Sequence, residues 1–268
     1  MALFCPTSQN RVAPIGGNQQ IVKALESRLQ RQIKYGKKLI AARKDNAGKI
    51  ELTFNNSPSE KFDAVVFAVP FSTLREVDLQ GLQLPQWKLD AIKNLVYGTN
   101  SKLMVGFNSR PWATLGSNGS SYADLPYLQG TWETNPSQAT YNRAVLTNYT
   151  GGNLGAGLNS KKLQREAANF LSNLKFIFPG TDIAAAKINN TEFLAYLENW
   201  SFNPLTKGSY TCNQPGYFTT IAGNEGKSVN NLYFAGEHTN SFYEWQGFME
   251  GAAISGINAA QQILRDFK

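Results

Sequence analysis

Apolar and polar residues follow two different periods near the start of the chain. Four apolar residues recur at helical spacing: Ile21, Val22, Leu25 and Leu29. This spacing predicts an amphipathic helix over residues 18 to 32. Two strands are expected next, at residues 38 to 44 and 49 to 54, because an Asn-Ala-Gly turn separates two β-type segments.

Two near-continuous apolar runs lie far apart in the sequence. Residues 62 to 70, FDAVVFAVP, form the first run, and residues 232 to 235 form the second. Such runs are typical of strands that are covered on both faces in a mostly parallel sheet. Pro70 closes the first run because proline has no N–H for the strand ladder. The two ends of the chain are therefore expected to build one α/β layer together.

The middle of the chain predicts mainly antiparallel strands. Residues 100 to 107 have the pattern of a strand, and residues 119 to 150 contain Tyr, Thr and Val runs broken by Gly and Asn. A helix is expected over residues 160 to 177. Residues 151 to 157, GGNLGAG, lack the Lys-Ser/Thr pair of a phosphate-binding loop and are interpreted as a flexible connector. The prediction is an α/β protein with mixed sheets, in which residues 71 to 225 interrupt the layer built from the chain ends.

The stretch NLYFAGEHTNSFYEWQGFMEGAAISG carries the strongest chemical signal. Gly236 ends a buried strand, and strand ends in open α/β sheets are where ligands bind. Gly247 and Gly251 have no Cβ, so a flat ligand would approach the backbone closely there. Met249 opens a helix whose free N–H groups suit a phosphate or an electron-rich ring edge. An ordinary C-terminal helix preceded by two turns is the alternative interpretation.

The residues of that helix fall into two sizes. Small residues would allow close packing on a neighbour: Ala252, Ser255, Gly256 and Ala259. Larger residues would add apolar contacts: Ile254, Ile257, Ile263 and Leu264. The helix is therefore expected to pack through both sets.

Composition and charge exclude several classes of function. The 268 residues carry a formal net charge of +7, but the positive residues are scattered and do not interleave with aromatic ones, which disfavours a nucleic-acid binder. Cys5, Cys212 and a single His do not make a metal site, so none is expected. The chain shows no secretory leader and no apolar run near the roughly 20 residues of a membrane span, so a soluble cytoplasmic protein without membrane contact is expected.

Four segments, in the same order, resemble the flavin-containing amine oxidases, a family that includes monoamine, polyamine and L-amino-acid oxidases. The segments are Ile15-Gly16-Gly17 with the helix that follows, FDAVVFAVPFSTLREV at 62 to 77, the W…G.Y…PG pattern at 200 to 216, and YFAGEHT with the later MEGA. The likeness covers nearly the whole chain. It implies an FAD-dependent oxidoreductase that transfers hydride from a C–N bond to flavin, with oxygen as the acceptor.

The resemblance also implies the residues that bind the cofactor. The backbone of Leu39 would meet the adenine end of FAD, although Leu is also an ordinary strand residue. Glu237 would lie near the pyrophosphate and ribityl portion, and Met249 would face the isoalloxazine ring. Three glycines join this set: Gly236, Gly247 and Gly251. Ser209 stands where many members carry a flavin-linking Cys, so non-covalent FAD is expected.

Three catalytic residues follow from the same resemblance. Tyr210 and Trp245 match the aromatic pair that flanks the substrate amine, where ring faces attract a cation and orient its C–H bond. Lys102 matches a lysine that holds a water against flavin. Alone, each aromatic is also consistent with a core residue, and Lys102 with a solvent-facing strand lysine. His238 is interpreted as support for the loop and not as a base.

The sequence departs from the family in one respect, because no GxGxxG turn follows any strand. The expected organisation is a partial FAD-binding domain, 1 to 70 with 226 to 268, and a substrate-binding domain, 71 to 225. The glycine-rich N-terminal half is expected as a missing segment or a separate partner chain. A non-enzymatic or degenerate module that needs such a partner is the alternative.

The substrate is a small-molecule amine or amino acid, and the sequence does not decide between them. An amino acid would need a cation for its carboxylate, and three are available: Arg75, Arg110 and Arg143. A polyamine would need acidic residues, and three are again available: Asp124, Glu133 and Glu244.

Overall fold

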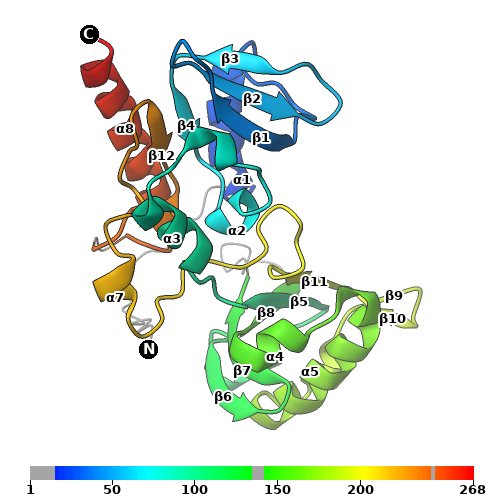
Figure 1. The fold of residues 1–268 in the computed structure, drawn as a ribbon. Coiled ribbons are helices and arrows are strands. Elements are labelled where there is room, and N and C mark those ends of the chain that lie inside the picture. The colour runs from blue at the N-terminus through cyan, green and yellow to red at the C-terminus, as the bar shows by residue number, and fades with distance from the viewer. Residues whose placement is uncertain (1–15, 135–141, 243–244) are drawn as a thin grey trace.

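The fold consists of two lobes of secondary structure, in a computed structural model that describes residues 16–134, 142–242 and 245–268. Elements from both ends of the chain form one lobe, and elements from its middle form the other (Figure 1). Ile15, Cys5 and Glu244, which the sequence analysis named, lie outside the described residues. The mixture of helices with parallel and antiparallel strands confirms the predicted α/β class.

The first lobe begins with a three-stranded antiparallel sheet. Its strands, in the order β1-β2-β3, are β1 (Leu39–Lys44), β2 (Ile50–Phe54) and β3 (Glu60–Phe62). At the turn between β1 and β2, the Asp45 carboxylate accepts the backbone N–H groups of Ala47 and Lys49. The two predicted strands and their turn are therefore confirmed.

A parallel pair of strands joins the two ends of the chain. It consists of β4 (Val65–Phe67) and β12 (Leu232–Phe234), with Val65 opposite Leu232 and Phe67 opposite Phe234. The expectation that β4 would be covered on both faces is wrong, because the side chain of Val66 is 40% exposed. The following helices cover the face that holds Val65 and Phe67, whereas the C-terminal helix covers the other face only at β12.

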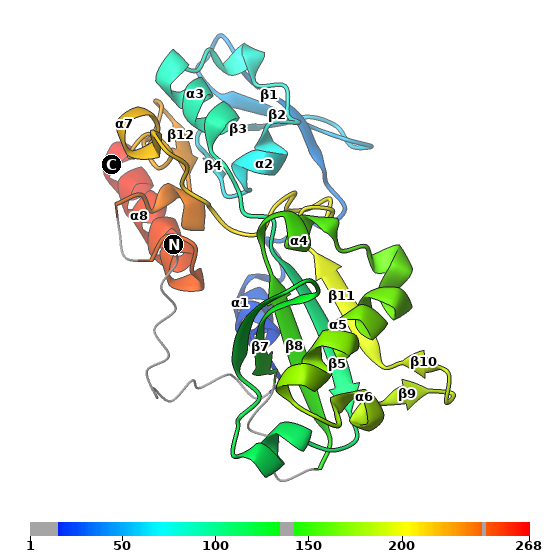
Figure 2. The same ribbon diagram turned by 90° about the horizontal axis from the view of Figure 1, so that it is seen from below.

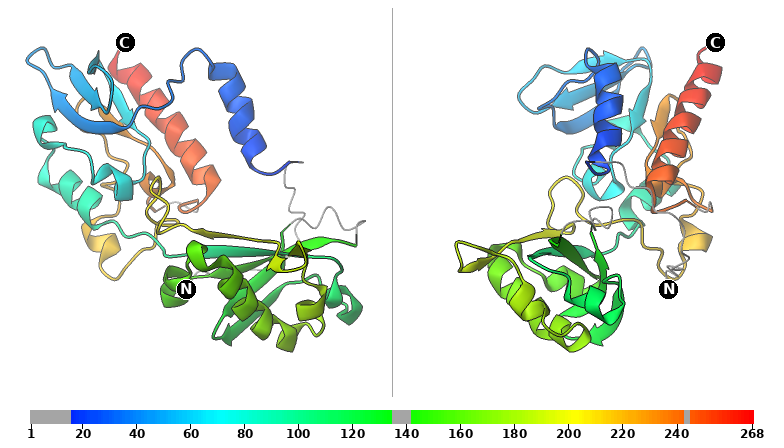
Figure 3. Two further views of the ribbon diagram at one scale, coloured as in Figure 1. Left: turned by 90° about the vertical axis from the view of Figure 1, so that its right-hand side faces the viewer. Right: turned by 180° about the vertical axis from the view of Figure 1, so that it is seen from behind.

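Five α-helices of the described residues belong to this lobe. They are α1 (Gln19–Leu29), α2 (Phe71–Leu74), α3 (Gln86–Asn94), α7 (Tyr217–Thr220) and α8 (Met249–Asp266), with a 3-10 turn η1 (Gln80–Leu82). The predicted helix α1 is confirmed, yet none of its residues is buried, and Figure 3 shows it standing outside the rest of its lobe. Among the helices that the structure describes, none combines the length and hydropathy needed to cross a bilayer.

The C-terminal helix α8 packs mainly through small residues, and Ile263 is the large residue that packs partly buried beside them. Gly251, Ser255 and Ala259 are its buried residues, and they recur every four positions along one face. Ile254, Ile257 and Leu264 are exposed, so the expectation that the large residues would add contacts is wrong for these three. The small face lets the helix approach β12 closely, which turns the larger side chains outward.

The second lobe is built on a five-stranded antiparallel sheet. Its order is β11-β5-β8-β7-β6, with β5 (Ser101–Phe107), β6 (Ser121–Leu125), β7 (Leu128–Glu133), β8 (Ala144–Thr150) and β11 (Ala195–Asn199). Shorter elements complete it: η2 (Pro111–Leu115), α4 (Gly152–Gly157), η4 (Ser160–Lys162), α6 (Thr181–Ala184) and the hairpin β9 (Lys187–Ile188) with β10 (Glu192–Phe193). Helix α5 (Leu163–Ile177) lies across one face of the sheet (Figure 2). Its Phe170 and Leu174 pack with Leu103 and Val105 in one buried core.

The glycine-rich segment between β8 and α5 forms the short helix α4, so its interpretation as a flexible connector is wrong. A Cβ on Gly155 would lie 2.4 Å from the carbonyl oxygen of Thr99 and 2.7 Å from that of Thr150. The amide of Asn199 donates to the carbonyls of Gly155, Ala156 and Leu158. Close packing on two strand ends, together with this buried amide, fixes the segment.

A buried lysine and a buried histidine lie beneath the end of β12. The Lys88 ammonium is fully buried, donates to the carbonyls of Asn224 and Glu225, and lies 3.8 Å from the centre of the Phe234 ring. Burial lowers the pKa of Lys88 to about 7. The His238 ring lies 4.4 Å from the Phe71 ring, and burial with the nearby Lys88 charge lowers the pKa of His238 to about 3.

We expect Gly155→Ala to destabilise the protein by about 1–3 kcal/mol, because its new methyl group meets backbone atoms that cannot move aside. Gly157→Ala is the matched control in the same helix, since nothing lies within 4 Å of its Cβ position. The control is expected to be neutral or slightly stabilising. Urea unfolding measures both, and equal midpoints for the two variants would contradict the account of α4.

We expect the buried His238 to make the protein less stable as the pH falls below 6.5. The unfolded state takes up a proton near the ordinary histidine value of 6.5, whereas the folded state does so only near about 3. Between these values the unfolded state binds more protons, so unfolding becomes easier by up to about 1.4 kcal/mol per pH unit, and by about 1 kcal/mol between pH 6.5 and 5.5. Urea unfolding at pH 6.5 and 5.5 should show this loss in the wild type relative to His238→Gln, which does not titrate. Parallel losses in both proteins would refute it.

Candidate active site

Gly247, just before α8, and Gly251, in its first turn, are required for different structural reasons. Gly247 has a φ of +85°, and its Cβ position lies 3.7 Å from Cδ2 of Tyr210, so the Tyr210 ring lies beside this backbone. A Cβ on Gly251 would lie 2.2 Å from the carbonyl oxygen of Trp245. Gly251 is therefore needed for the Trp245 backbone to pack on the first turn of α8.

The carboxylate of Glu237 connects two segments of the site. Glu237 begins the 3-10 turn η5 (Glu237–Thr239), directly after Gly236 at the end of β12. It accepts the backbone N–H of Thr211 at 3.1 Å, the Thr211 hydroxyl at 2.9 Å and the backbone N–H of Gly247 at 2.8 Å. Burial raises the pKa of Glu237, and the bonds from Thr211 and Gly247 oppose that rise. The Glu237 side chain thus connects the segment after Tyr210 to the loop before α8.

Tyr149 links two of the predicted catalytic residues. Lys102 on β5 lies directly opposite Tyr149 on β8 in the sheet register. The Tyr149 hydroxyl donates to the Tyr210 hydroxyl at 3.2 Å, and burial with this bond raises the pKa of Tyr149. The sequence analysis missed Tyr149. Its place in a predicted strand was visible, but the register that sets it between Lys102 and Tyr210 was not.

The remaining predicted residues are distributed on both sides of the α8 start. The Trp245 side chain is 42% exposed, and its ring meets the Phe248 ring edge-on at 6.1 Å. Met249 is exposed, and the amide of Asn18 contacts its sulfur at 3.9 Å, which brings the segment before α1 to the start of α8. Leu39 lies in β1 opposite Phe54, in the antiparallel sheet.

A cavity of about 120 Å³ lies next to Gly236 and Glu237. It is lined by Ala68, Pro70, Tyr97, Thr206, Gly208, Ser209, Gly236, Glu237 and His238. Two buried polar atoms in this region, Nε2 of His238 and Nδ2 of Asn240, have no hydrogen-bond partner within the described part of the chain. Unpaired buried groups of this kind indicate that a polar ligand or water is part of the complete site.

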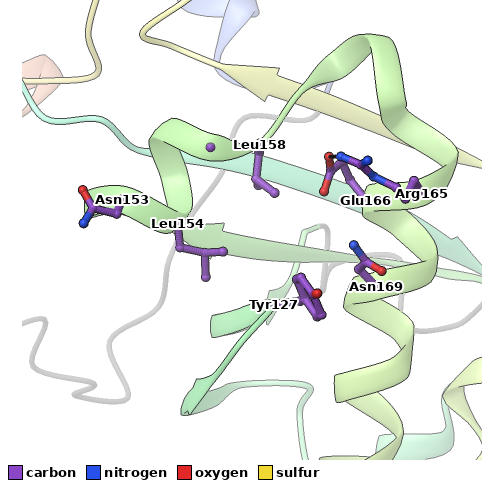
Figure 4. Close-up of a pocket in the computed structure, with 8 residues that line it drawn as sticks. Tyr127, Asn153, Leu154, Leu158, Arg165, Glu166 and Asn169 are labelled. Atoms are coloured by element: carbon purple, nitrogen blue, oxygen red, sulfur yellow. Dashed lines mark hydrogen bonds and ion pairs between the residues drawn. The ribbon is translucent and has the colours of Figure 1, made fainter.

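A larger cavity of about 460 Å³ lies elsewhere, between α4 and α5 of the second lobe (Figure 4). Leu154 and Leu158 form its apolar wall, and the Arg165 guanidinium reaches the Glu166 carboxylate at 3.2 Å. None of the predicted site residues lines it. The smaller cavity is therefore the one that coincides with the candidate chemistry.

The charged residues considered for substrate binding are engaged in other contacts or exposed. Arg75 donates to the carbonyls of Ile92 and Leu95. Arg110 pairs with Glu133 at 2.8 Å, so each neutralises the other. Two further candidates, Asp124 and Arg143, are exposed.

In the described ranges, no three His, Cys, Asp or Glu side chains gather closely enough to hold a metal ion.

Comparison with known proteins identifies the family. A family model described as flavin containing amine oxidoreductase matches residues 3–264. “Probable polyamine oxidase 4” of Arabidopsis thaliana is 32% identical over 206 residues, which are 76% of this chain and 38% of that protein. L-amino-acid oxidase 4 of Hebeloma cylindrosporum is 29% identical over 234 residues, which cover 76% of this chain and 35% of the relative.

A solved structure agrees in fold. Cyclohexylamine oxidase from Brevibacterium oxydans IH-35A superposes with a TM-score of 0.80 at 17% identity, over 94% of this chain and 53% of that chain. The chain thus spans about half of that structure and less of the two curated relatives. Because the family model covers almost every residue, this chain belongs to the flavin-containing amine oxidoreductase family.

Proposed function

We propose that this chain forms the part of an FAD-dependent amine or amino-acid oxidase that faces the flavin ring and the substrate. One observation carries the proposal. The Tyr210 ring lies beside Gly247, the Trp245 backbone packs on Gly251, and Glu237 joins the two segments at the start of α8. Two aromatic residues and the start of a long helix therefore share one location, next to the small cavity beside Glu237.

The residues at this location fit the flavin end of FAD. The first turn of α8 has backbone N–H groups without intrahelical partners, which suit electron-rich ring atoms. The unpaired atoms of His238 and Asn240 suit the oxygen-rich chain that joins the ring to the phosphates. FAD, when bound, supplies the hydride acceptor for oxidation of the C–N bond. Binding is non-covalent in this proposal, since Ser209 stands at the linking position and donates to Asn100.

The aromatic residues of the chain would bind and orient the amine. Tyr210 and Trp245 present ring faces to a cation, and Tyr149 fixes the Tyr210 hydroxyl. Lys102 lies opposite Tyr149 on the neighbouring strand. It would hold a water and move a proton when oxygen reoxidises the flavin. The substrate is an amine or an amino acid, and its imine product hydrolyses to a carbonyl compound.

A complementing glycine-rich half, in the same polypeptide or in a second chain, would hold the ADP portion of FAD. Apolar surface that such a half would cover is exposed on three elements of the described chain. It comprises Ile21, Val22, Leu25 and Leu29 on α1, Val66 on β4, and Ile254, Ile257 and Leu264 on α8. In this division, residues 1 to 70 and 226 to 268 belong to the FAD-binding domain, and residues 71 to 225 form the substrate-binding domain, although helices α2, α3 and α7 of that range pack in the core of the first lobe.

Production of the chain alone and together with the N-terminal half of a relative tests this function. We expect little FAD in the purified chain alone, and a yellow complex with flavin absorbance when the complementing half is present. The complex should then release hydrogen peroxide with benzylamine, spermidine or L-phenylalanine. A complex that is folded but does not retain FAD would refute the oxidase proposal and support a non-enzymatic module.

We expect Tyr210→Leu and Trp245→Leu to weaken amine binding to that complex by roughly 5- to 30-fold, the range for a cation–π contact of about 1–2 kcal/mol. Benzyl alcohol, which has no charge, should bind equally well to the wild type and the variants. Tyr196→Leu is the control, because this tyrosine is exposed on the neighbouring strand β11. Equal losses for the amine and the alcohol would show that the rings act only by packing.

A further inference from the structure

We propose that Glu237 is a positioning residue, whose carboxylate sets the spacing between the Tyr210 segment and the Trp245 segment. Its consequence for catalysis rests on the proposed oxidase function, although the contacts themselves do not. The three residues Glu237, Thr211 and Gly247 are called the clamp below. Resemblance to the family indicated instead that Glu237 would lie near the cofactor.

The two carboxylate oxygens of Glu237 accept hydrogen bonds from two different segments of the chain. Oε1 accepts the backbone N–H of Thr211 at 3.1 Å, and Oε2 accepts the backbone N–H of Gly247 at 2.8 Å. The Thr211 hydroxyl lies 2.9 Å from each carboxylate oxygen. A carboxylate has no donor of its own when ionised, so it matches these donors without any unpaired group.

Each side of the clamp continues into a backbone that has little freedom. On the Thr211 side, the carbonyl of Tyr210 accepts the N–H of Gly98 at 2.8 Å, and the N–H of Cys212 donates to Val96 at 2.9 Å. Thr211 itself is buried and bridges to Tyr97. The clamp therefore holds the Tyr210 segment at a point where its backbone is already hydrogen-bonded to Val96 and Gly98 on both sides of Thr211.

On the Gly247 side, the backbone of the flanking residues packs against the first turn of α8. The N–H of Phe248 donates to the carbonyl of Trp245 at 3.1 Å, and the same carbonyl lies against Gly251. Gly247 thus sits in a tight turn between Trp245 and α8, and its own N–H is the group that Glu237 holds. Any shift of the carboxylate moves this turn relative to the Tyr210 ring beside it.

The carboxylate of Glu225 holds the loop before α8 through a separate set of hydrogen bonds, which provides a control. Glu225 accepts from the hydroxyl groups of Tyr217 and Ser241, and the amide of Gln246 donates to the Tyr217 hydroxyl at 2.8 Å. This network contacts Gln246, the residue before Gly247, but among the described residues it makes no hydrogen bond to Thr211 or to the Gly247 N–H. Tyr217→Phe therefore loosens the loop without touching the clamp.

Amide hydrogen exchange, followed by NMR at one pH, tests the clamp in the full chain without a cofactor. In Glu237→Gln one carboxylate oxygen becomes an NH₂ group that faces an N–H donor, so one of the two backbone bonds is lost, and we expect the amide of Thr211 or of Gly247 to exchange about 10-fold faster or more. Tyr217→Phe should leave both amides protected. Equal acceleration in the two variants would overturn the proposal.

A double-mutant cycle keeps the test decisive if Glu237→Gln is poorly stable. Thr211→Val removes only the hydroxyl, and we expect it to speed exchange at Gly247, because the carboxylate loses one of the groups that orient it. In the Glu237→Gln background, the same change should have no further effect on Gly247. Unchanged Gly247 exchange in Thr211→Val, or full additivity in the double variant, would refute coupling through the carboxylate.

The complemented enzyme then connects the clamp to catalysis. We expect Glu237→Gln to lower kcat by about 10-fold or more with a smaller change in KM, because misplaced rings still bind the amine but no longer orient it. A rise in KM alone would contradict a positioning role. If the amides respond as expected but the complex retains no FAD, the clamp stands and the oxidase proposal fails.

Discussion

Parallel pairing of residues 65 to 67 with residues 232 to 234 is the constraint on which the site depends. These strands are more than 160 residues apart, and no local signal joins them. Their pairing sets Pro70 and Gly236, which follow the two strands, at the same edge of the sheet, where both line the small cavity. It also directs the chain from β12 into η5 and α8. Without this contact, Glu237 and the start of α8 would have no fixed position relative to the Tyr210 segment.

Much of this arrangement could be predicted from the sequence, because it follows from local periodicity. The helix at Ile21 to Leu29, the strands of the middle lobe and the start of α8 at Met249 all carried the right spacing. Family resemblance supplied the chemistry that periodicity lacks. The positions of the catalytic residues stay a prediction, although Lys102, Tyr149 and Tyr210 form a continuous series of neighbours.

The errors arose where packing between distant segments overrides local preference. Glycines favour flexibility in isolation, but Gly155 is pressed between two strand ends, so the segment becomes a helix. Large apolar residues usually face a core, but the small residues of α8 allow a closer approach to β12 and turn Ile254 and Ile257 outward. The direction of the Glu237 carboxylate was not predicted at all, since only the fold reveals which N–H groups it meets.

The two lobes differ in how far each buries its own apolar surface. In the second lobe, the sheet and helix α5 bury each other's apolar surface in one core. Its members Phe107, Trp112 and Phe170 are almost fully buried. In the first lobe, all of α1, one face of β4 and the outer face of α8 remain open. The clamp needs no such covering surface, because Glu237, Thr211 and Gly247 all belong to this chain. Under the proposed function, orientation of the aromatic residues is therefore an internal property of the chain, whereas retention of FAD would depend on the half that covers the open surface.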